Sequence, residues 1–505
     1  MKNVLIYSPT KREQLTRILE EANGLTALTE FVNLPGHADL CIEDNTLSIS
    51  PDWSGGSPPI LFPARLPFTE EALIRLVYAR LGAFDKALEH LNPASPLYQE
   101  LWCCYILQQG QEVFPEWLQA NEGSMTDHAR MHNRAVLVQY GNVRLAAEDR
   151  YAQVKALYYE AAKKPCHPEH DAFSLVQLST LLADHAATDE LNQLLNTIET
   201  ANLSIPARMA VQSRRCRAGM LQVVRGEKPL PENTLTANYQ ELVQYFAQSG
   251  NEPEEGLHRT ELAYLLHLAG NTRAALEHNN RAISLFRELE VPELLGEAWM
   301  QRGELLHAFA QQPDQKHQYA AAVKSYQESL KIFSREHTPY RFAEIHHQLG
   351  LIYTDMPAPE HKKGMLAAIA VSSFEEALSY FTPDKFPYEH ASVCNHYGCA
   401  YIKFPRAHNA DNYDRAIGLL QKALAIRTAD EFPEERCLTL LNYLEILWQM
   451  PNPINPEGLD YARYEEMVEV AGEIMHTTGD PHLRDAATDH LNELKKLRQT
   501  VNPNA

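Results

Sequence analysis

Residues 339–353 read Pro-Tyr-Arg-Phe-Ala-Glu-Ile-His-His-Gln-Leu-Gly-Leu-Ile-Tyr, an apolar pattern with helical spacing that starts at a proline and has a glycine near its middle. This layout recurs, because Pro292, Pro339, Pro387, Pro433 and Pro481 follow one another at steps of 47, 48, 46 and 48 residues. Eleven residues after the first four prolines stand, in order, Gly303, Gly350, Gly398 and Leu444. A fixed period in the range of 20–50 residues is typical of stacked supersecondary units, so the spacing predicts a helical repeat protein.

Each unit is predicted to contain two antiparallel helices. Proline suits the first helical turn, where its missing N–H group would have no partner. Glycine in mid-helix costs about 1 kcal/mol relative to alanine, so a recurring glycine indicates that a second helix crosses close to the backbone. We expect the glycines to be buried against the second helix of their own pair, which carries a repeated pattern of small and bulky residues: Ala322/Tyr326/Ser329, Ala370/Phe374/Ala377, Ala416/Leu420/Ala423 and, more loosely, Tyr464/Val468/Ala471.

These units resemble the tetratricopeptide repeat (TPR) family over roughly residues 253–476. The matching first helices are Trp299-x2-Arg302-Gly303, His346-x2-Leu349-Gly350-x2-Tyr353 and Cys394-x2-Tyr397-Gly398-x2-Tyr401, and Leu262-Ala263-x2-Leu266 belongs to a unit with a short turn. The resemblance implies an all-α, right-handed superhelical solenoid of antiparallel helix pairs. The repeats are longer than is usual in the family and resemble extended bacterial arrays, so we expect the extra residues in turns within the repeats, at Gln311–Tyr319, Met356–Lys363, Phe404–Tyr413 and Met450–Gly458.

The remainder of the chain is predicted to contain two further regions. Residues 1–66 read as a small α/β cap with a strand at 3–7, a helix at Lys11–Ala22 and a hairpin formed by Leu40–Ile42 and Leu47–Ile49. This cap is expected either to cover the apolar end of the solenoid or to have a role of its own. Residues 67–225 read as divergent helical repeats, Gly226–Asn233 as a break, and 235–500 as the TPR-like array with a capping helix at its C-terminus.

The composition of the chain disfavours some classes of binding partner. The net charge of −21 disfavours nucleic acid and anionic membranes, because both attract cationic surfaces. No apolar stretch reaches the roughly 20 residues of a membrane span, and the apolar run at the start of the sequence is too short for a signal peptide. The eight cysteines lack paired zinc spacing. We therefore expect a cytoplasmic location and free thiols.

Candidate chemical groups lie at Cys394, Cys399, His346 and His390. Cys394 and His390 are four residues apart on a predicted helix and offer zinc-type ligands, but Cys394 stands at a repeat position that packs against the neighbouring helix. A cysteine–histidine nucleophile would need an electropositive setting, and these surroundings are acidic. No catalytic residue, metal or cofactor is predicted. The alternative of an enzyme would have to place its site in the N-terminal region.

The resemblance to TPR proteins implies that the first helix of each pair lines a concave groove. Its lining positions carry five acids and one lysine, without the cations with which some family members clamp a terminal carboxylate. We predict a non-catalytic scaffold that binds a cationic or amphipathic protein segment, with its histidines gaining charge towards pH 6. A peptide-sensing regulator and a merely solvated helix face are the alternatives. The predicted partner-binding residues are Tyr264, His267, Glu297, Glu304, His307, Glu344, His347, Asp355, Asn395, Glu445 and Trp448.

Overall fold

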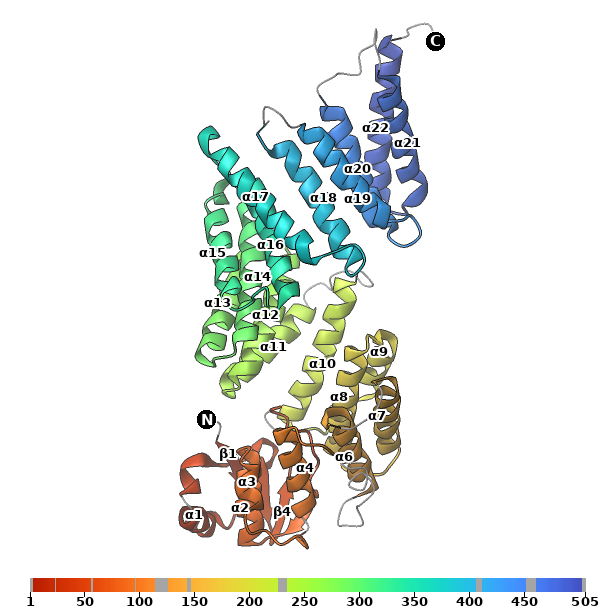
Figure 1. The fold of residues 1–505 in the computed structure, drawn as a ribbon. Helices are drawn as coiled ribbons and strands as arrows, with labels where there is room; N and C mark the ends of the chain where they lie inside the picture. The colour runs from red at the N-terminus through yellow and green to blue at the C-terminus, as the bar shows by residue number, and fades with distance from the viewer. Residues whose placement is uncertain are drawn as a thin grey trace. The chain divides into compact units, whose positions relative to one another are not determined.

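The structure is a computed structural model that describes residues 3–22, 24–55, 58–95, 97–113, 126–142, 147–225, 234–405, 411–450 and 460–501. The chain divides into two compact units, Met1–Leu265 and Leu266–Ala505. Helices dominate both units, and a small mixed sheet lies near the N-terminus (Figure 1). This confirms the predicted fold class of TPR-like helix pairs with a small α/β segment.

The sheet of the N-terminal unit has the strand order β2-β1-β3-β4-β5. Strand β1 pairs in parallel with β2 and β3, and β3-β4-β5 is antiparallel. The predicted hairpin is confirmed as β3 and β4, and its turn residues Asp44 and Asn45 both have positive φ, as a type I′ turn requires. The strands are β1 (Val4–Tyr7), β2 (Thr29–Val32), β3 (Leu40–Glu43), β4 (Thr46–Ile49) and β5 (Arg65–Pro67).

The helices of the N-terminal unit follow the apolar periodicity of the sequence. In helix α6 the side chain of Thr126 caps the N-terminus by accepting a hydrogen bond from the N–H of Ala129. The helices are α1 (Arg12–Glu21), α2 (Glu70–Arg80), α3 (Phe84–Leu88), α4 (Tyr98–Gln109), α6 (Asp127–Tyr140), α7 (Ala147–Ala162), α8 (Pro168–Asp184), α9 (Thr188–Thr197), α10 (Ile205–Val224), α11 (Thr234–Gln248) and α12 (Glu252–Leu268), the last of which crosses into the second unit.

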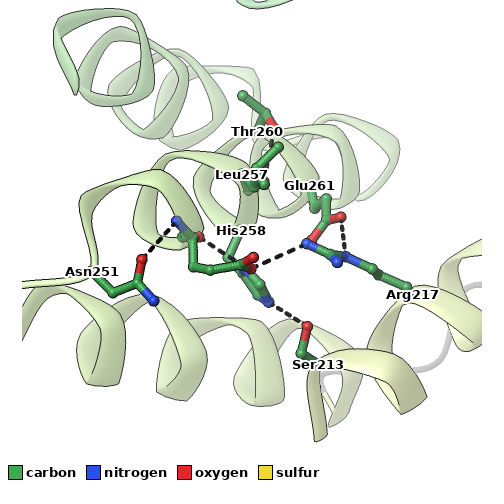
Figure 2. A network of polar contacts seen from close by, with 8 residues as sticks. Ser213, Arg217, Asn251, Leu257, His258, Thr260 and Glu261 are labelled. Atoms are coloured by element: carbon green, nitrogen blue, oxygen red, sulfur yellow. Dashed lines mark hydrogen bonds and ion pairs between the residues drawn. The ribbon is translucent and has the colours of Figure 1, made fainter. Parts of the chain in front are cut away.

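A buried polar network joins α10 to α12 (Figure 2). Arg217 lies 2.7 Å from the carboxylate of Glu261 and 3.4 Å from that of Glu254. The ring of His258 contacts the hydroxyl of Ser213 at 2.8 Å through Nε2 and the carbonyl of Glu254 at 2.8 Å through Nδ1. Burial lowers the pKa of His258 to about 3, so this histidine is neutral at physiological pH and its contact with the Glu254 carboxylate is not an ion pair.

The helices of the C-terminal unit begin at the predicted prolines, which stand first in α14, α16, α18, α20 and α22. Each of these packs against the helix that follows or precedes it, and neighbouring pairs are visible in Figure 1 as α14 with α15, α16 with α17 and α18 with α19. The elements are α13 (Thr272–Glu288), α14 (Pro292–Ala310), η3 (Pro313–Gln315), α15 (Gln318–Leu330), α16 (Pro339–Asp355), α17 (Glu360–Tyr380), α18 (Pro387–Lys403), α19 (Asn412–Ile426), α20 (Pro433–Gln449), α21 (Tyr461–Thr477) and α22 (Pro481–Val501).

The repeated glycines are buried against the second helix of their own pair, as predicted. A Cβ atom placed on Gly350 would lie 2.8 Å from ring carbons of Phe374, and one on Gly398 would lie 3.0 Å from the carbonyl oxygen of Ala416. Gly303 meets Tyr326 even more closely. Since real Cβ contacts are wider than this, the glycines permit an approach of two helices that alanine would obstruct.

One expectation about the turns is wrong. The extra residues predicted in a loop at Met356–Lys363 largely extend the second helix, because α17 already begins at Glu360 and runs for 21 residues. In the Gln311–Tyr319 stretch, η3 forms within the turn as expected for a segment that contains Pro313. The stretches 406–410, 451–459 and 226–233, which hold parts of the other two predicted turns and the predicted break, lie outside the described residues.

Across the part of the chain described above, none of the helices is both long enough and apolar enough to cross a bilayer.

Candidate partner-binding surface

The first helices of successive pairs contact one another directly, as α14 with α16, α16 with α18 and α18 with α20. We call these four helices the first-helix layer. Nine of the eleven predicted partner-binding residues lie on it: Glu297, Glu304 and His307 on α14, Glu344, His347 and Asp355 on α16, Asn395 on α18, and Glu445 and Trp448 on α20. The other two, Tyr264 and His267, lie on α12, with Tyr264 in the N-terminal unit and His267 in the C-terminal unit.

Glu297 and Glu344 share one arginine. The Nε atom of Arg341 lies 2.7 Å from Oε1 of Glu297, and its Nη1 atom lies 2.6 Å from Oε2 of Glu344. The sequence reasoning missed Arg341, because it stands nine positions before Gly350, outside the positions that line the groove in the family. The acidic surface expected from the sequence is therefore partly neutralised from within the chain.

Glu304 is the carboxylate of this group that stays without a partner. It is exposed, and within the described residues it forms neither a hydrogen bond nor an ion pair. Its pKa is raised to about 7, first because surrounding protein removes water from the charged form, and then because the charges of Glu344 and Glu297 repel it. The Arg341 charge opposes this rise without cancelling it. Unlike Glu297 and Glu344, Glu304 therefore has no cation of the described residues bound directly to its carboxylate, and it is mainly ionised only above about pH 7.

Asp355 is held in a different way. Its Oδ1 atom lies 2.7 Å from Nζ of Lys403, and its Oδ2 atom lies 3.6 Å from Nε2 of His307 and 3.4 Å from the amide nitrogen of Gln311. Burial alone would raise the pKa of Asp355, but the hydrogen bonds from His307 and Lys403 outweigh it and hold the pKa at about 2. Asp355 is ionised and already paired, so it offers less to a partner than the sequence suggested.

His347 does not behave as a surface histidine. Its Nε2 atom lies 2.8 Å from Nδ1 of His396, on the next first helix. Burial lowers the pKa of His347 to about 3 and that of His396 to about 4. The charge of a protonated His396 would lower the pKa of His347 further, and the charge of Arg427 lowers that of His396. Burial likewise lowers the pKa of His267. The expectation that these histidines gain charge as the pH falls towards 6 is therefore wrong for His347, which stays neutral there.

The predicted residues at the far end of the layer differ in availability. Asn395 is buried, and its Oδ1 atom accepts a hydrogen bond of 3.0 Å from the Nδ2 group of Asn442. The indole N–H of Trp448 donates to Nδ1 of His490 at 2.9 Å, so this ring is held by the terminal helix α22. Glu445 is exposed. The aromatic anchor expected at Trp448 is thus engaged within the chain.

The sulfur-containing candidates of α18 are in a setting that suppresses reactivity. Sγ of Cys394 lies 3.5 Å from Nε2 of His390, and the Nδ1 atom of His390 is 2.8 Å from the carbonyl of Phe381. Burial raises the pKa of both Cys394 and Cys399 to about 11. Thiols with such pKa values are protonated at neutral pH and are weak nucleophiles. This supports the packing role inferred from the repeat position of Cys394.

An aromatic bridge between repeats was not predicted. The ring of Tyr340, directly after one repeat proline, lies 5.8 Å from that of Phe386, directly before the next, and Tyr388 repeats this contact with Phe432 at 5.8 Å. Tyr340 and Tyr388 remain 37% and 46% exposed, so they also present apolar surface at the start of α16 and α18 in the first-helix layer. The signal was available in the sequence, since an aromatic residue follows two of the repeat prolines.

No family model and no curated protein matches the sequence. Among solved structures, a Pyrococcus horikoshii signal transduction ATPase with a tetratricopeptide repeat sensor shares 14% identity over 85% of this chain with a TM-score of 0.49, and this chain spans only 55% of that protein. Yeast Tom70 shares 11% identity over 86% of this chain and 83% of its own length, with a TM-score of 0.38. At such low similarity these proteins carry no information about function. The proline and glycine register and the helix pairs of the chain itself identify its fold as TPR-like.

Proposed function

We propose that the protein is a non-catalytic scaffold whose first-helix layer binds a lysine- or arginine-bearing segment of a partner protein. The observation that carries the proposal is the uncompensated carboxylate of Glu304. It is exposed and feels the charges of two other carboxylates, Glu297 and Glu344, while one guanidinium pairs with both of those.

The charge of this cluster favours a cationic ligand. At pH values above the pKa of Glu304, the three glutamates and Arg341 together carry a net charge of about −2. A cationic side chain placed beside Glu304 would supply a counter-charge and lower the pKa of that carboxyl group. Binding of this kind strengthens as the pH rises through about 7, because more of Glu304 is then ionised. It also weakens with added salt, since an exposed pair is screened.

Adjacent repeats could read one extended segment. Polar pairs such as Gln311 with Asp355 and Tyr340 with Glu389 link positions 44 and 49 residues apart, which is about one repeat, so side chains of neighbouring repeats lie together on this surface. The exposed rings of Tyr340 and Tyr388 would add apolar contact to such a ligand. An amphipathic segment with a basic residue fits these features better than a purely basic one.

The test uses an array of short peptides that vary in charge and apolar content, probed with the full-length chain. The proposal expects retained peptides to be enriched in lysine or arginine beside apolar residues, and it expects Glu304→Gln to lose them. Glu375→Gln is the matched control, because Glu375 is an exposed carboxylate on the second helix α17. Retention that is indifferent to Glu304→Gln, or a preference for acidic peptides, would contradict the proposal.

A further inference from the structure

A histidine, a cysteine and an aspartate meet in the N-terminal unit, far from the first-helix layer in sequence. His128 is in the first turn of α6, Cys166 precedes α8, and Asp171 is in the first turn of α8. One ligand atom from each lies within 4.8 Å of the other two. In the described part of the chain this is the one group of three such ligands that come so close.

Asp171 shows that the group is chemically incomplete. Its Oδ1 atom is buried and has no hydrogen-bond partner. A buried carboxylate oxygen without a partner is costly, because it loses its hydration and gains nothing in exchange. A cation placed between the three side chains would satisfy this oxygen.

His128 can offer a ring nitrogen at little cost. Its Nδ1 atom lies 2.9 Å from the carbonyl oxygen of Ala161, and its Nε2 atom lies 2.8 Å from Oγ of Ser174 and 3.2 Å from the carbonyl oxygen of His170. Each of these three oxygens has a second contact. Ala161 accepts from the N–H of Lys164, His170 accepts from Ser174, and Ser174 also contacts His132. One ring nitrogen of His128 would exchange its present contact for the metal while the other keeps the ring oriented, as in known metal sites.

The thiol of Cys166 determines which metal the three side chains would prefer. Cys166 is a free cysteine, and a cysteine binds a metal as its thiolate. A thiolate–imidazole–carboxylate set suits zinc, whereas magnesium and calcium prefer oxygen ligands alone. Cys166 and Asp171 are only partly buried, which leaves an entry path for the ion.

We propose that His128, Cys166 and Asp171 bind one zinc ion and leave a fourth position for water. Three protein ligands with one open position are the arrangement of zinc sites that exchange a ligand. Because metal ligands bind in their deprotonated forms, zinc affinity should rise with pH. The proposal departs from the prediction that the protein binds no metal. The sequence did not indicate the site, because 38 residues separate His128 from Cys166 and the ligands have no recognisable zinc spacing.

The test uses the full-length chain purified without chelator. Elemental analysis, before and after dialysis against zinc, should give one zinc per chain, and titration with cobalt should produce the near-ultraviolet thiolate-to-metal absorption band. Cys166→Ser should abolish that band, and Asp171→Asn should weaken cobalt binding by more than the roughly 10–100-fold that loss of an outer-shell partner costs. Cys399→Ser, which changes a partly buried cysteine in the other unit, should leave both readings unchanged.

Two results would overturn the site. One is less than stoichiometric zinc after dialysis, and the other is a thiolate band in Cys166→Ser equal to that of the unaltered chain. Circular dichroism and thermal melting establish that each variant is folded before its metal content is read. If Cys166→Ser fails to fold, cobalt affinity of Asp171→Asn decides the matter, and an unchanged affinity rejects the proposal.

Discussion

The ammonium of Lys403 lies 2.7 Å from the carboxylate of Asp355, although 48 residues separate them in sequence. The distance in sequence is one repeat, and the contact joins equivalent helices of neighbouring pairs. Because Lys403 is largely exposed, this pair contributes at most about 1 kcal/mol to stability. Its significance is geometric, since it shows that residues one repeat apart become neighbours on the first-helix layer.

Gly350→Ala should destabilise the protein. The added Cβ would lie 2.8 Å from the ring of Phe374, which is fully buried and cannot move aside freely. We expect a loss of about 1–3 kcal/mol in the free energy of unfolding, from overpacking, and a larger loss for Gly350→Leu. Chemical denaturation measures both.

Gly418→Ala is the control for this substitution. Gly418 is also in a helix, α19, but a Cβ there meets nothing within 4 Å. It should stabilise the protein by up to about 1 kcal/mol, because alanine is the better helix former. Equal effects of the two alanine variants would show that the close crossing at Gly350 is absent.

Arg341→Met should strengthen binding of a lysine-bearing peptide. It removes the cation that serves Glu297 and Glu344, and so leaves three carboxylates facing the ligand. We expect an affinity gain of roughly threefold to tenfold at low salt, in line with one exposed charge contact. Arg335→Met, which removes a charge from the turn before α16, should change affinity little. A loss of affinity in Arg341→Met would mean that Arg341 itself contacts the partner.

Glu100 should make the protein less stable as the pH rises. This glutamate is 3% exposed, one of its oxygens has no hydrogen-bond partner, and burial raises its pKa to about 7 from an ordinary value of 4.5. The folded state therefore binds more protons than the unfolded state between these pH values, and stability from this group falls as the pH rises through them. Between pH 5 and pH 8, the free energy of unfolding of the unaltered chain should fall by a few kcal/mol relative to that of Glu100→Gln. Chemical denaturation at each pH measures this difference. A constant difference would contradict the burial of an ionisable carboxyl group.

His258 should make the protein less stable as the pH falls. Its folded-state pKa of about 3 is below the ordinary 6.5, because burial and the charge of Arg217 disfavour the imidazolium. The unfolded state binds more protons between these values, so stability is complete above pH 6.5 and falls as the pH drops through this window. His258→Gln should reduce the loss of stability between pH 7 and pH 5 by roughly 2 kcal/mol. A loss of stability between pH 7 and pH 5 that is the same in His258→Gln and in the unaltered chain would contradict this assignment.

The repeat fold could be predicted because each proline and glycine meets a local backbone requirement that recurs at constant spacing. A proline that starts a helix, such as Pro339, and a glycine that permits a close helix crossing, such as Gly350, can be recognised from the local sequence. Neither inference therefore needed tertiary information. Arg341 was missed because its function depends on how far a long side chain reaches across to the preceding repeat. The burial of His347 was missed because it depends on His396, one repeat later, and helical periodicity does not show which polar residues pair across helices.

The zinc ligands proposed for the N-terminal unit show a second limit of prediction from the sequence. Cys166 and Asp171 are five residues apart, but His128 joins them only because α6 is packed near the start of α8. The parallel partner of β1 was likewise not predicted, since β2 is a short strand in a segment of mixed composition. Contacts of this kind are set by tertiary packing rather than by local pattern.

The most direct test of the central claim is carbodiimide coupling of the tightest lysine-bearing peptide to the full-length chain, followed by mass spectrometry of the coupled residue. The reagent joins a carboxylate to an amine only when the two are in contact. The account predicts that the peptide amine is coupled to Glu304 on α14, and that Glu304→Gln removes this product while Glu375→Gln keeps it. Coupling that maps instead to residues 1–66, or that persists unchanged in Glu304→Gln, would contradict the assignment of partner binding to the first-helix layer.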